Sequence, residues 1–523
     1  MVYKKFAVAI LAAAVGACAQ IERAPQSATS SEVAPGIDAN ADSFEAISQN
    51  IMDAAEPALP PNDIWQRLRQ GFSLDRELDR AKVKDYVNYF SSNQGYMARV
   101  TERSRRYIFH VAEQLEQSNV PMEFALLPIV ESAYDPFAYS HAQASGMWQF
   151  IPATGRSFGL HQNWWYDGRR DVVESTRAAS EYFNYLSAKF DGDWLLVLAA
   201  YNAGEGTVRR AMERNRRKGK GTSFWDLKLP RETQRYVPQL LALAEVVARS
   251  DHYRVPLHDV GNTPYYTAVN VGSQIDLAQA AELADVEIEE LYLLNPGYNR
   301  WATDPNGSHR LLIPQDKSAR FIAELEKLPP EQRVSWQRYQ VARGDSLSVI
   351  ARRYETTVSA IQQTNKLRGS RIRAGQTLLI PSASGPSAQY AYSIDQRVQR
   401  KQSSGNGDKS SYTVRPGDTL WGIARSLNVK VRQLASWNSM APGDTLRPGQ
   451  KLVAYTKAKT SNDTSRTTRK VSYRVRNGDS LYRIARKFSI DISDIVRWNK
   501  ISKNSYLQPG QRLTLFVDSA SNG

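Results

Sequence analysis

The sequence of 523 residues predicts a multidomain protein in which an all-α domain is followed by small α+β modules of βααβ type. Three observations predict this. Apolar residues recur at helical spacing between about residues 65 and 249, with little strand-type alternation. A pattern of about 43 residues repeats three times after residue 338. The charge changes at the same place, since residues 1–330 hold 35 basic and 41 acidic side chains whereas residues 331–523 hold 33 and 12.

Composition and charge narrow the classes of protein to which the chain can belong. Apolar residues make up 41% and charged residues 23%, which excludes a wholly disordered chain and a multi-span membrane protein. The net charge is −6 over residues 1–330 and +21 over residues 331–523. This division predicts different partners for the two parts, and an anionic partner for the C-terminal part.

The first residues have the features of an export signal. Two lysines within residues 1–5 precede the small and apolar run Phe6–Val15, and Gly16 and Ala17 then lead to Cys18. Cys18 is the only cysteine of the chain, so it cannot form an internal disulfide. The segment resembles a bacterial lipoprotein box, which implies that Cys18 carries a lipid. An ordinary signal peptide with a chance cysteine is the alternative.

The location of the protein follows from this signal. By analogy with lipoproteins, Ala19 rather than Asp after the cysteine favours the outer membrane. We expect residues 1–18 to be a lipoprotein signal peptide and residues 19–59, rich in Ala, Pro, Ser and Asn, to be a flexible tether. The protein is then bound through its lipid to the periplasmic face of the outer membrane. Export removes nucleic acid as a partner and leaves the polymers of the bacterial cell envelope.

Residues 60–255 form the predicted all-α domain, which is long enough to bury a core. One helix face is predicted from apolar spacing, with Ala178, Tyr182, Phe183, Leu186 and Phe190. The run from Trp194 to Tyr201 suits a buried helix. Pro121 suits a first helical turn, and Pro128 is expected to kink the helix that follows.

Glu131 is the candidate acid of this domain. It follows seven uncharged residues, Phe124–Val130, and a carboxyl group among apolar groups is poorly solvated as an anion. Its pKa then rises, so that it holds a proton near neutral pH and can protonate a glycosidic oxygen. On this evidence alone, an exposed helical glutamate is the alternative.

Three further motifs follow Glu131 and Ser132 along the chain. They are Ser145–Thr154 (Ser-Gly-Met-Trp-Gln-Phe-Ile-Pro-Ala-Thr), Ala199–Gly204 (Ala-Ala-Tyr-Asn-Ala-Gly) and Glu232–Val237 (Glu-Thr-Gln-Arg-Tyr-Val). The ordered set resembles the goose-lysozyme-like lytic transglycosylases, which implies a lysozyme-like catalytic domain. Trp148 departs from this family, in which Met is common, and we expect it to reshape the sugar site without removing it.

The resemblance implies a mechanism with one carboxylate. Glu131 would protonate the oxygen leaving C1 of N-acetylmuramic acid, while the 2-acetamido group of the sugar stabilises the cation. Glu131 would then take the proton of the C6 hydroxyl, which closes onto C1 and leaves a 1,6-anhydromuramoyl end without consuming water. The residues expected to hold Glu131 and the sugar are Ser132, Gly146, Met147, Gln149, Tyr201, Asn202 and Tyr236.

Some of these residues have a second interpretation. Core packing is the alternative for Tyr201, and helix capping is the alternative for Asn202. Gly146 and Gly204 are expected to allow close approach of the backbone rather than to contact the sugar.

Two other functions stay open. A hydrolysing muramidase on the same fold needs a second carboxylate, for which Asp135 is the nearest in sequence. A non-catalytic peptidoglycan-binding scaffold is disfavoured, because decay of the site would have removed at least one motif. The six histidines show no ligand spacing and no cysteine besides Cys18 is present, so we expect no metal, no cofactor and no cysteine-peptidase chemistry. We also expect a monomer.

The repeated pattern predicts a strand, two helices and a strand in each copy. A Tyr starts each copy, and Gly-Asp-Ser/Thr-Leu follows; Ile-Ala comes six residues after that glycine and Asn comes 21 residues after it. Each copy ends on Gly-Gln before an apolar strand. We expect the glycine to permit the turn and the aspartate to cap the first helix. The copies resemble the LysM module, a βααβ unit that binds glycans containing N-acetylglucosamine, such as peptidoglycan.

In the LysM family the glycan groove lies where the Gly-Asp-Ser/Thr turn meets the loop after the second helix. The resemblance therefore implicates Gly344, Asp345, Ser346, Asn365, Gly417, Asp418, Thr419, Asn438, Gly478, Asp479, Ser480 and Asn499. A purely structural turn or cap is an equal alternative for the aspartates. Trp421 and Tyr482 share an aligned position at which the first copy has Ser348. If these rings stack on sugar rather than on their own module, the first copy binds more weakly.

The remaining segments connect these units. The expected LysM copies are residues 338–382, 411–455 and 472–518, with Ser-, Gly-, Lys- and Thr-rich linkers at residues 383–410 and 456–471. Residues 256–330 are expected to be a connecting domain, either a degenerate copy of the repeat or an unrelated fold. We expect the partner to be the glycan strands of peptidoglycan, with the basic charge adding salt-sensitive adhesion to its peptide carboxylates.

Overall fold

The computed structural model describes residues 62–354, 356–456, 468–476, 479–488, 490, 492–502 and 507–518. The predicted signal peptide with Cys18, the predicted tether at residues 19–59 and Gly478 of the third copy lie outside these residues. None of the helices within the described ranges combines the length and the apolar character that crossing a membrane requires.

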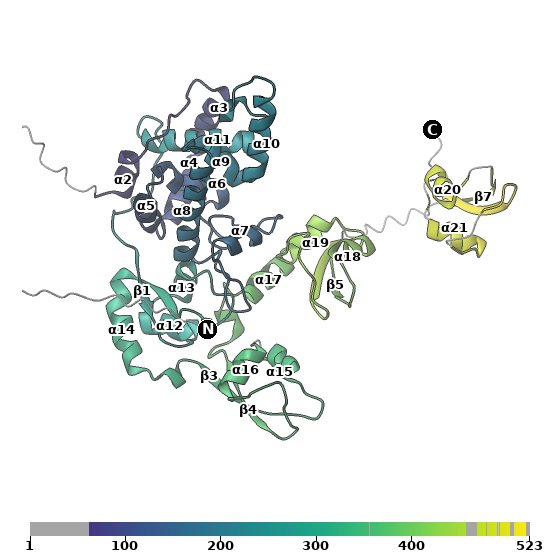
Figure 1. Cartoon of the computed structure of the whole chain (residues 1–523). Helices are drawn as coiled ribbons and strands as arrows, with labels where there is room; N and C mark the ends of the chain where they lie inside the picture. Colours follow the sequence, from purple (N-terminus) through teal and green to yellow (C-terminus); the bar gives the residue numbers. More distant parts are fainter. Residues whose placement is uncertain are drawn as a thin grey trace, which may run out of the picture. The chain divides into compact units, whose positions relative to one another are not determined.

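The N-terminal part of the described chain is built of helices, as predicted (Figure 1). Between residues 64 and 248, all of which are described, the chain forms only isolated β-bridges and no strand. The helices are α2 (Ile64–Gln70), α3 (Ala81–Ser92), α4 (Gln94–Ser104), α5 (Ile108–Gln117), the 3-10 helix η1 (Met122–Leu126), α6 (Leu127–Ser132), α7 (Pro152–Ser157), α8 (Val172–Lys189), α9 (Trp194–Ala203), α10 (Glu205–Arg216), the 3-10 helix η2 (Phe224–Asp226) and α11 (Thr233–Ala248).

Helices α9 and α11 lie side by side in this domain. α11 contacts α3, α6 and α9, and α9 also contacts α8 and α10. α9 is the buried helix predicted from the apolar run, and Asp193 starts it by accepting hydrogen bonds from Leu195 N and Leu196 N at 3.0 Å. The contacts of α11 with α6 and α9 bring three of the sequence motifs to one place.

The segment that leads to Glu131 differs from the prediction, because Pro128 does not kink a helix. Pro128 lies in the first turn of α6, where the missing N–H of proline leaves no helical hydrogen bond unmade. Pro121 directly precedes η1. The segment is therefore a 3-10 helix followed by a short α-helix, and Glu131 lies in the last turn of α6.

Residues 266–314 form a βααβ unit. β1 (Tyr266–Asn270) pairs antiparallel with β2 (Arg310–Pro314), and α12 (Leu277–Ala284) and α13 (Ile288–Leu294) connect them. The helix that follows is α14 (Ser318–Lys327), flanked by the 3-10 helices η3 (Gln315–Lys317) and η4 (Pro330–Gln332). The order of elements is that of the repeated copies, which favours a degenerate copy over an unrelated fold.

Each of the three repeated copies forms strand, helix, helix and strand, as predicted. The two strands of each copy pair antiparallel, and each copy has an apolar core of its own. The elements are β3 (Ser335–Gln340), α15 (Leu347–Arg353), α16 (Val358–Thr364) and β4 (Thr377–Ser382); β5 (Asp408–Thr413), α18 (Leu420–Ser426), α19 (Val431–Trp437) and β6 (Lys451–Thr456); and β7 (Thr468–Arg474), α20 (Leu481–Phe488), α21 (Ile492–Asn499) and β8 (Arg512–Asp518).

The residue that caps the first helix of each copy is Ser or Thr, and the expectation of an aspartate cap is wrong. In the first copy Ser346 Oγ accepts a hydrogen bond from Val349 N at 3.3 Å. Asp345 lies one residue too early and locks the preceding turn, since its Oδ2 accepts from Ala342 N at 2.8 Å and from Tyr339 OH at 2.5 Å. The other two copies repeat both arrangements.

The segment expected to be a linker, residues 383–410, is partly folded. It contains η5 (Ser387–Gln389) and α17 (Ile394–Ser403). Tyr390 is buried, and its OH donates to Asp276 Oδ2 at 2.9 Å. The polar composition of the segment predicted a linker. This prediction failed because Tyr390 is buried against a residue more than 100 positions away, and local composition contains no information about such a contact. The second expected linker is outside the described residues at 457–467.

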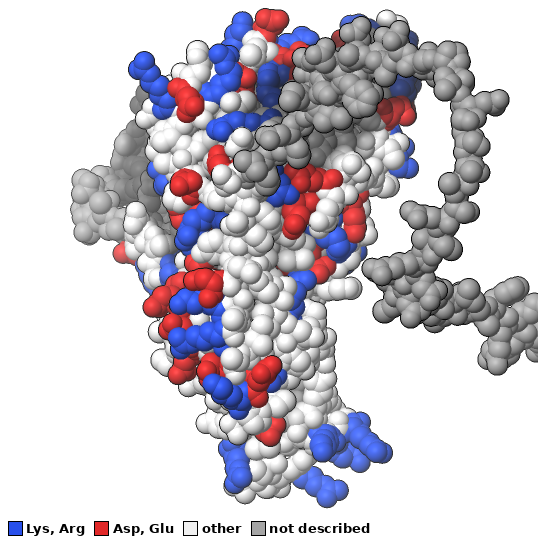
Figure 2. Space-filling view, turned by 90° about the vertical axis from the view of Figure 1, so that its left-hand side faces the viewer, with Lys and Arg blue, Asp and Glu red and all other residues white. Residues whose placement is uncertain are grey.

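Charged side chains are unevenly distributed over the surface, and the C-terminal part of the sequence has a basic excess. In Figure 2, Lys and Arg mix with Asp and Glu over the upper part, whereas the lower end shows Lys and Arg without acidic side chains. The first copy, residues 339–381, holds seven basic and two acidic residues.

Candidate active site

A cavity of about 730 Å³ lies in the helical domain, and residues from all the predicted motifs line it. The predicted site residues that line it are Glu131, Gln149, Tyr201, Asn202 and Tyr236. Three other predicted residues do not line it, namely Ser132, Gly146 and Met147. The cavity thus collects side chains from α6, α9 and α11 and from the segment between α6 and α7.

Glu131 lies at the wall of this cavity, and Tyr236 OH donates a hydrogen bond to its Oε1. Burial raises the pKa of the Glu131 carboxyl to about 7. The hydrogen bond from Tyr236 lowers this pKa and the negative charge of Glu232 raises it, but desolvation is the largest of the three effects. A substantial fraction of Glu131 is therefore protonated near neutral pH, as the uncharged run before it predicts.

Tyr201 and Tyr236 are neutral hydroxyl donors at the cavity. Burial raises the pKa of each hydroxyl well above its ordinary value, and the nearby Glu131 carboxylate raises it further. Tyr236 uses its hydroxyl on Glu131, whereas Tyr201 OH donates to Trp148 O at 2.7 Å. Tyr201 therefore supports the segment that carries Gln149, and its ring packs against Phe183 in the core.

Ser132, Gly146 and Met147 lie behind the cavity wall and shape it. Ser132 Oγ donates to Met147 O at 3.0 Å and to Pro128 O at 3.1 Å, which ties α6 to the following segment. The Met147 side chain is fully buried. Gly146 has φ of 81°, and a Cβ placed there would lie 2.1 Å from Arg169 O, so the expected close backbone approach is present.

Gln149 and Trp148 belong to the same segment but face different surroundings. Gln149 lines the cavity, and its Nε2 donates to Gly146 O at 2.7 Å, so that the side chain also braces its own turn. Trp148 is fully buried, and its Nε1 donates to Thr176 Oγ1 at 3.1 Å. Trp148 thus fills the core and does not line the cavity. The expectation that it reshapes the sugar site by direct contact is therefore wrong.

Asn202 and Gly204 end helix α9. Asn202 Oδ1 accepts a hydrogen bond from Thr233 Oγ1 at 2.7 Å, which ties α9 to the start of α11. Gly204 has φ of 81°, and a Cβ placed there would have no neighbour within 4 Å. Glycine is therefore required at position 204 by the positive φ of the backbone. The close approach of another part of the backbone, which we expected there, is not present among the described residues.

Glu232 also lines the cavity. It begins the motif Glu232–Val237, but it was not among the site residues predicted from the sequence. It is exposed and comes directly before α11, four residues before Tyr236, so helical spacing would have placed both on one face. Arg235 and Gln239 of α11 line the cavity too. Asp135, the second carboxylate considered from the sequence, is not among the lining residues; its Oδ1 accepts from Phe137 N in a turn.

In the repeated copies, the implicated Asn side chains hold each module together. Asn438 Nδ2 donates to Leu434 O at 2.7 Å and to Val453 O at 2.8 Å, and its Oδ1 accepts from Val453 N at 2.8 Å. Asn365 and Asn499 make the same three bonds. These amides join the second helix to the returning strand of each module, and Asn438 Oδ1 also accepts from Gln402 Nε2 of α17 at 2.8 Å.

The aligned position after the turn differs between copies. The Trp421 side chain is 61% exposed, and the Arg425 guanidinium carbon lies 5.3 Å from the centre of its ring. Ser348 in the first copy pairs its hydroxyl with Ser346 Oγ at 3.0 Å. An exposed indole presents a face on which a sugar ring can stack, and a serine hydroxyl does not.

Family models match most of the described chain. Residues 109–224 match the transglycosylase SLT domain. Residues 265–329 match the LysM-like domain of lytic transglycosylase MltD. The LysM domain matches three times, at residues 339–381, 412–454 and 473–516.

The chain is also similar to known proteins. It is 37% identical over 424 residues, 78% of this chain and 88% of the relative, to membrane-bound lytic murein transglycosylase D of Escherichia coli strain K12. A putative tributyltin chloride resistance protein of Alteromonas sp. strain M-1 is 41% identical over 133 residues, 25% of this chain and 64% of that protein. The solved 70 kDa soluble lytic transglycosylase Slt70 of Escherichia coli aligns with 33% of this chain and 31% of its own, at 21% identity and a TM-score of 0.23.

Proposed function

Because the chain belongs to the family of membrane-bound lytic murein transglycosylase D, and is a lytic transglycosylase with LysM modules that bind peptidoglycan, we propose that Glu131 is its single acid and base. The observation that carries the proposal is the desolvated Glu131 carboxyl at the cavity wall, with a pKa raised to about 7. At this pKa the group can both give and take a proton near neutral pH.

In the proposed reaction the proton of Glu131 passes to the oxygen that leaves C1 of N-acetylmuramic acid, and the glycosidic bond to N-acetylglucosamine breaks. The 2-acetamido group of the same sugar stabilises the cation at C1. Glu131, now an anion, takes the proton of the C6 hydroxyl while that oxygen bonds to C1. The enzyme recovers its proton, and the products are a 1,6-anhydromuramoyl end and a free N-acetylglucosamine hydroxyl, with no water consumed.

The other cavity residues have supporting roles in this proposal. Tyr236 orients the Glu131 carboxyl, to which it donates a hydrogen bond. Gln149 and Asn202 line the cavity and offer amide groups to the acetamido-sugar. The segment that carries Gln149 is held in place by Ser132 and Tyr201, whose hydroxyls bond to Met147 O and Trp148 O. Gly146 lets this segment approach the backbone of Arg169 closely. Since the C6 hydroxyl is already attached to the reacting sugar, the cavity needs chiefly to exclude water and to hold geometry.

A hydrolysing muramidase remains the alternative, and its second carboxylate would be Glu232 rather than Asp135. Glu232 lines the cavity and interacts with the charge of Glu131, whereas Asp135 does not line it. A base for water requires a carboxylate on the cavity. The alternative can therefore be tested at one position.

The deciding experiment is mass spectrometry of the products that the purified protein releases from sacculi. We expect 1,6-anhydro ends from the wild type, no turnover from Glu131→Gln, and anhydro ends at a nearly normal rate from Glu232→Gln. Reducing ends from the wild type, lost in Glu232→Gln, would establish hydrolysis instead. Turnover in Glu131→Gln would show that another group is the acid.

We also propose that the glycan grooves of the copies at residues 338–382, 411–455 and 472–518 are formed around their Gly-Asp-Ser/Thr turns, while the catalytic domain is residues 60–255. The exposed Trp421 beside the turn of the second copy supports this. Sacculus pull-down of a chain ending at residue 404, which keeps α17, should show weaker binding with normal cleavage of short soluble glycans. Equal loss of both would contradict the proposal.

The membrane anchor is a separate part of the proposal. We propose that Cys18 is lipidated, that the protein is a monomer, and that it lies at the periplasmic face of the outer membrane. The basic, apolar and small residues before Cys18 support this, as does the membrane-bound relative. Labelling with a fatty acid, cell fractionation and Cys18→Ala test it, since the variant should lose both label and membrane association.

A further inference from the structure

One wall of the cavity is a loop without regular secondary structure. This wall loop, residues 138–150, carries Gln149 and Phe150 into the cavity. Internal backbone bonds close it, from Gly146 N to Ala138 O at 3.0 Å and from Ser145 N to Phe150 O at 3.1 Å. Three further backbone bonds lie within the loop, from Ser140 N to Ala144 O, from Gln143 N to Ser140 O and from Gln149 N to Gly146 O. Because the loop contains no helix or strand, it also depends on bonds from outside to keep its side chains in place, as Ser132 and Tyr201 provide at Met147 O and Trp148 O.

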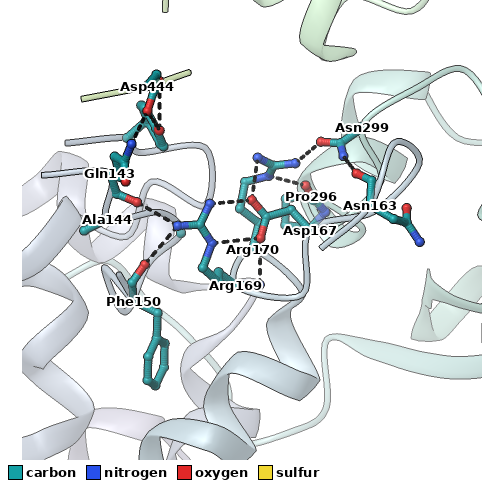
Figure 3. Close-up of polar contacts among 12 residues, drawn as sticks. Gln143, Ala144, Phe150, Asn163, Asp167, Arg169, Arg170, Pro296, Asn299 and Asp444 are labelled. Carbon is teal, nitrogen blue, oxygen red and sulfur yellow. Dashed lines mark hydrogen bonds and ion pairs between the residues drawn. The ribbon is translucent and has the colours of Figure 1, made fainter. Parts of the chain in front are cut away.

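Arg169 bonds to the wall loop at two points (Figure 3). Its Nη1 donates to Gln143 O at 2.6 Å and to Phe150 O at 3.2 Å, two points on either side of the Gly146 turn. Its Nε and Nη2 donate to the two carboxylate oxygens of Asp167 at 3.0 Å and 2.8 Å. Arg169 is only 5% exposed, so one guanidinium spans the loop in a site with little solvent.

The Asp167–Arg170 segment is in turn held by the LysM-like module, residues 265–329. Asp167 N donates to Gly297 O at 2.8 Å, and Arg170 Nε donates to Pro296 O at 2.8 Å. Arg170 Nη2 also donates to Asn299 Oδ1 (Figure 3). The turn at residues 296–299 therefore supplies acceptors for a guanidinium in the catalytic domain.

Charge makes these acceptors necessary. The buried group contains two guanidinium ions, Arg169 and Arg170, and one carboxylate, Asp167. The excess positive charge is met by carbonyl and amide oxygens, and a buried charge that loses such a partner is destabilised unless its surroundings rearrange. Removal of the Asn299 oxygen should therefore displace Arg170 and Asp167, and with them Arg169.

The LysM-like module has closed the place where the other copies are expected to bind glycan. Its two loops bond to each other, from Ile275 N to Thr303 Oγ1 and from Thr303 N to Ile275 O, both at 3.0 Å. Leu277 N also donates to Trp301 O at 2.8 Å. The loops that would form a groove thus satisfy each other, and the module presents its 296–299 turn to the catalytic domain.

We propose that the LysM-like module is a positioning element of the active site: Asn299 fixes Arg170, Asp167 and Arg169, and Arg169 fixes the wall loop that carries Gln149. The inference rests on the proposed function of the cavity, but the state of the loop can be measured without any reaction. Asn299 and Arg169 are positioning residues, since neither lines the cavity.

The test compares Asn299→Ala with Glu290→Gln in the full chain. Glu290 is a matched control because it joins the same module to the same domain elsewhere, accepting from Arg106 Nε at 3.0 Å and Nη2 at 2.7 Å. Hydrogen exchange of residues 143–150 should be at least about 10-fold faster in Asn299→Ala and unchanged in Glu290→Gln. The kcat/KM on a soluble glycan should fall about 10-fold in Asn299→Ala only.

Two further variants keep the test decisive. Asn299→Asp keeps an acceptor oxygen for Arg170 and should restore slow exchange and most of the activity. Arg169→Lys keeps the charge but cannot reach both loop carbonyls and Asp167 at once, and should open the loop even if Asn299→Ala does not fold. Equal behaviour of Asn299→Ala and Glu290→Gln, or slow exchange in Arg169→Lys, would overturn the proposal whatever the chemistry of Glu131.

Discussion

Two carboxyl groups in this chain each accept a hydrogen bond from a tyrosine hydroxyl, but their pKa values are shifted in opposite directions. Glu131 in the cavity accepts a hydrogen bond from Tyr236, and Asp345 in the first LysM copy accepts one from Tyr339. The pKa of Glu131 is raised to about 7 by burial. The pKa of Asp345 is lowered, first by the bond from Tyr339 and then by the bond from Ala342 N.

The difference shows that solvation, and not the tyrosine, decides the sign of the shift. In the cavity the cost of desolvating the anion exceeds the gain from the hydrogen bond. At the turn of the LysM copy, the hydrogen bonds from Tyr339 and Ala342 N outweigh the desolvation of Asp345, so the anion is favoured. One carboxyl can therefore move a proton near neutral pH, while the other stays charged and locks a turn. The predictions below test this contrast, beginning with the largest effect.

Replacing the cavity carboxyl should stop cleavage without affecting binding. Glu131→Gln cannot give or take a proton, and we expect kcat to fall by about 10³-fold or more, in the range of general acid–base catalysis. Sacculus binding should stay unchanged, because the LysM copies are untouched. Product release from sacculi and a pull-down on the same preparation measure the two. A parallel loss of binding would mean that the cavity and the LysM copies do not work separately.

Removing the tyrosine from the cavity pair should slow the enzyme and shift its pH profile. Tyr236→Phe should lower kcat about 10- to 100-fold, because Glu131 loses its orienting donor. The bond from Tyr236 lowers the pKa of Glu131, so the pKa should rise without it. If protonated Glu131 is the acid, activity falls as the pH rises through about 7 in the wild type, and this alkaline limb moves to higher pH in the variant. A limb that stays in place would assign it to another group.

The raised pKa also predicts how folding stability depends on pH. Between pH 4.5 and about 7 the folded protein keeps a proton on Glu131 that the unfolded chain has released. The wild type therefore loses stability as the pH rises through this window, and Glu131→Gln does not lose this part. We expect the variant to gain about 3 kcal/mol relative to wild type between pH 4.5 and pH 8. Urea unfolding of both proteins at the two pH values measures this difference in the free energy of unfolding. A variant that becomes less stable relative to wild type at the higher pH would contradict a raised pKa.

The smallest expected effect concerns the exposed side of the comparison. Trp421→Ala should weaken sacculus binding about 2- to 10-fold, as expected for loss of one aromatic contact. Since the side chain is 61% exposed, the melting temperature of the protein should change little. Cleavage of short soluble glycans serves as the control and should be unchanged. Unchanged binding would place the sugar contact of the second copy elsewhere.

The pattern of the sequence was sufficient for several features. Helical spacing predicted the all-α domain, and a constant offset between glycine and asparagine predicted three βααβ copies. The uncharged run before Glu131 predicted its raised pKa. These features depend on residues close to one another in the chain, or on a repeat, and both are readable without knowledge of distant contacts.

The interactions between distant segments were decided only by the tertiary structure. Ser132 does not line the cavity, and its hydroxyl holds the backbone at Met147. Tyr201 lines the cavity as expected for a residue near the sugar, but the bond of its hydroxyl to Trp148 O could not be read from the sequence. Residues 383–410 were expected to be a linker, but Tyr390 is buried against Asp276. Nothing in the local sequence of Arg170 indicates that it bonds to Asn299, 129 residues away. A side chain's partner and its burial depend on how elements pack, and local periodicity contains no information about that packing.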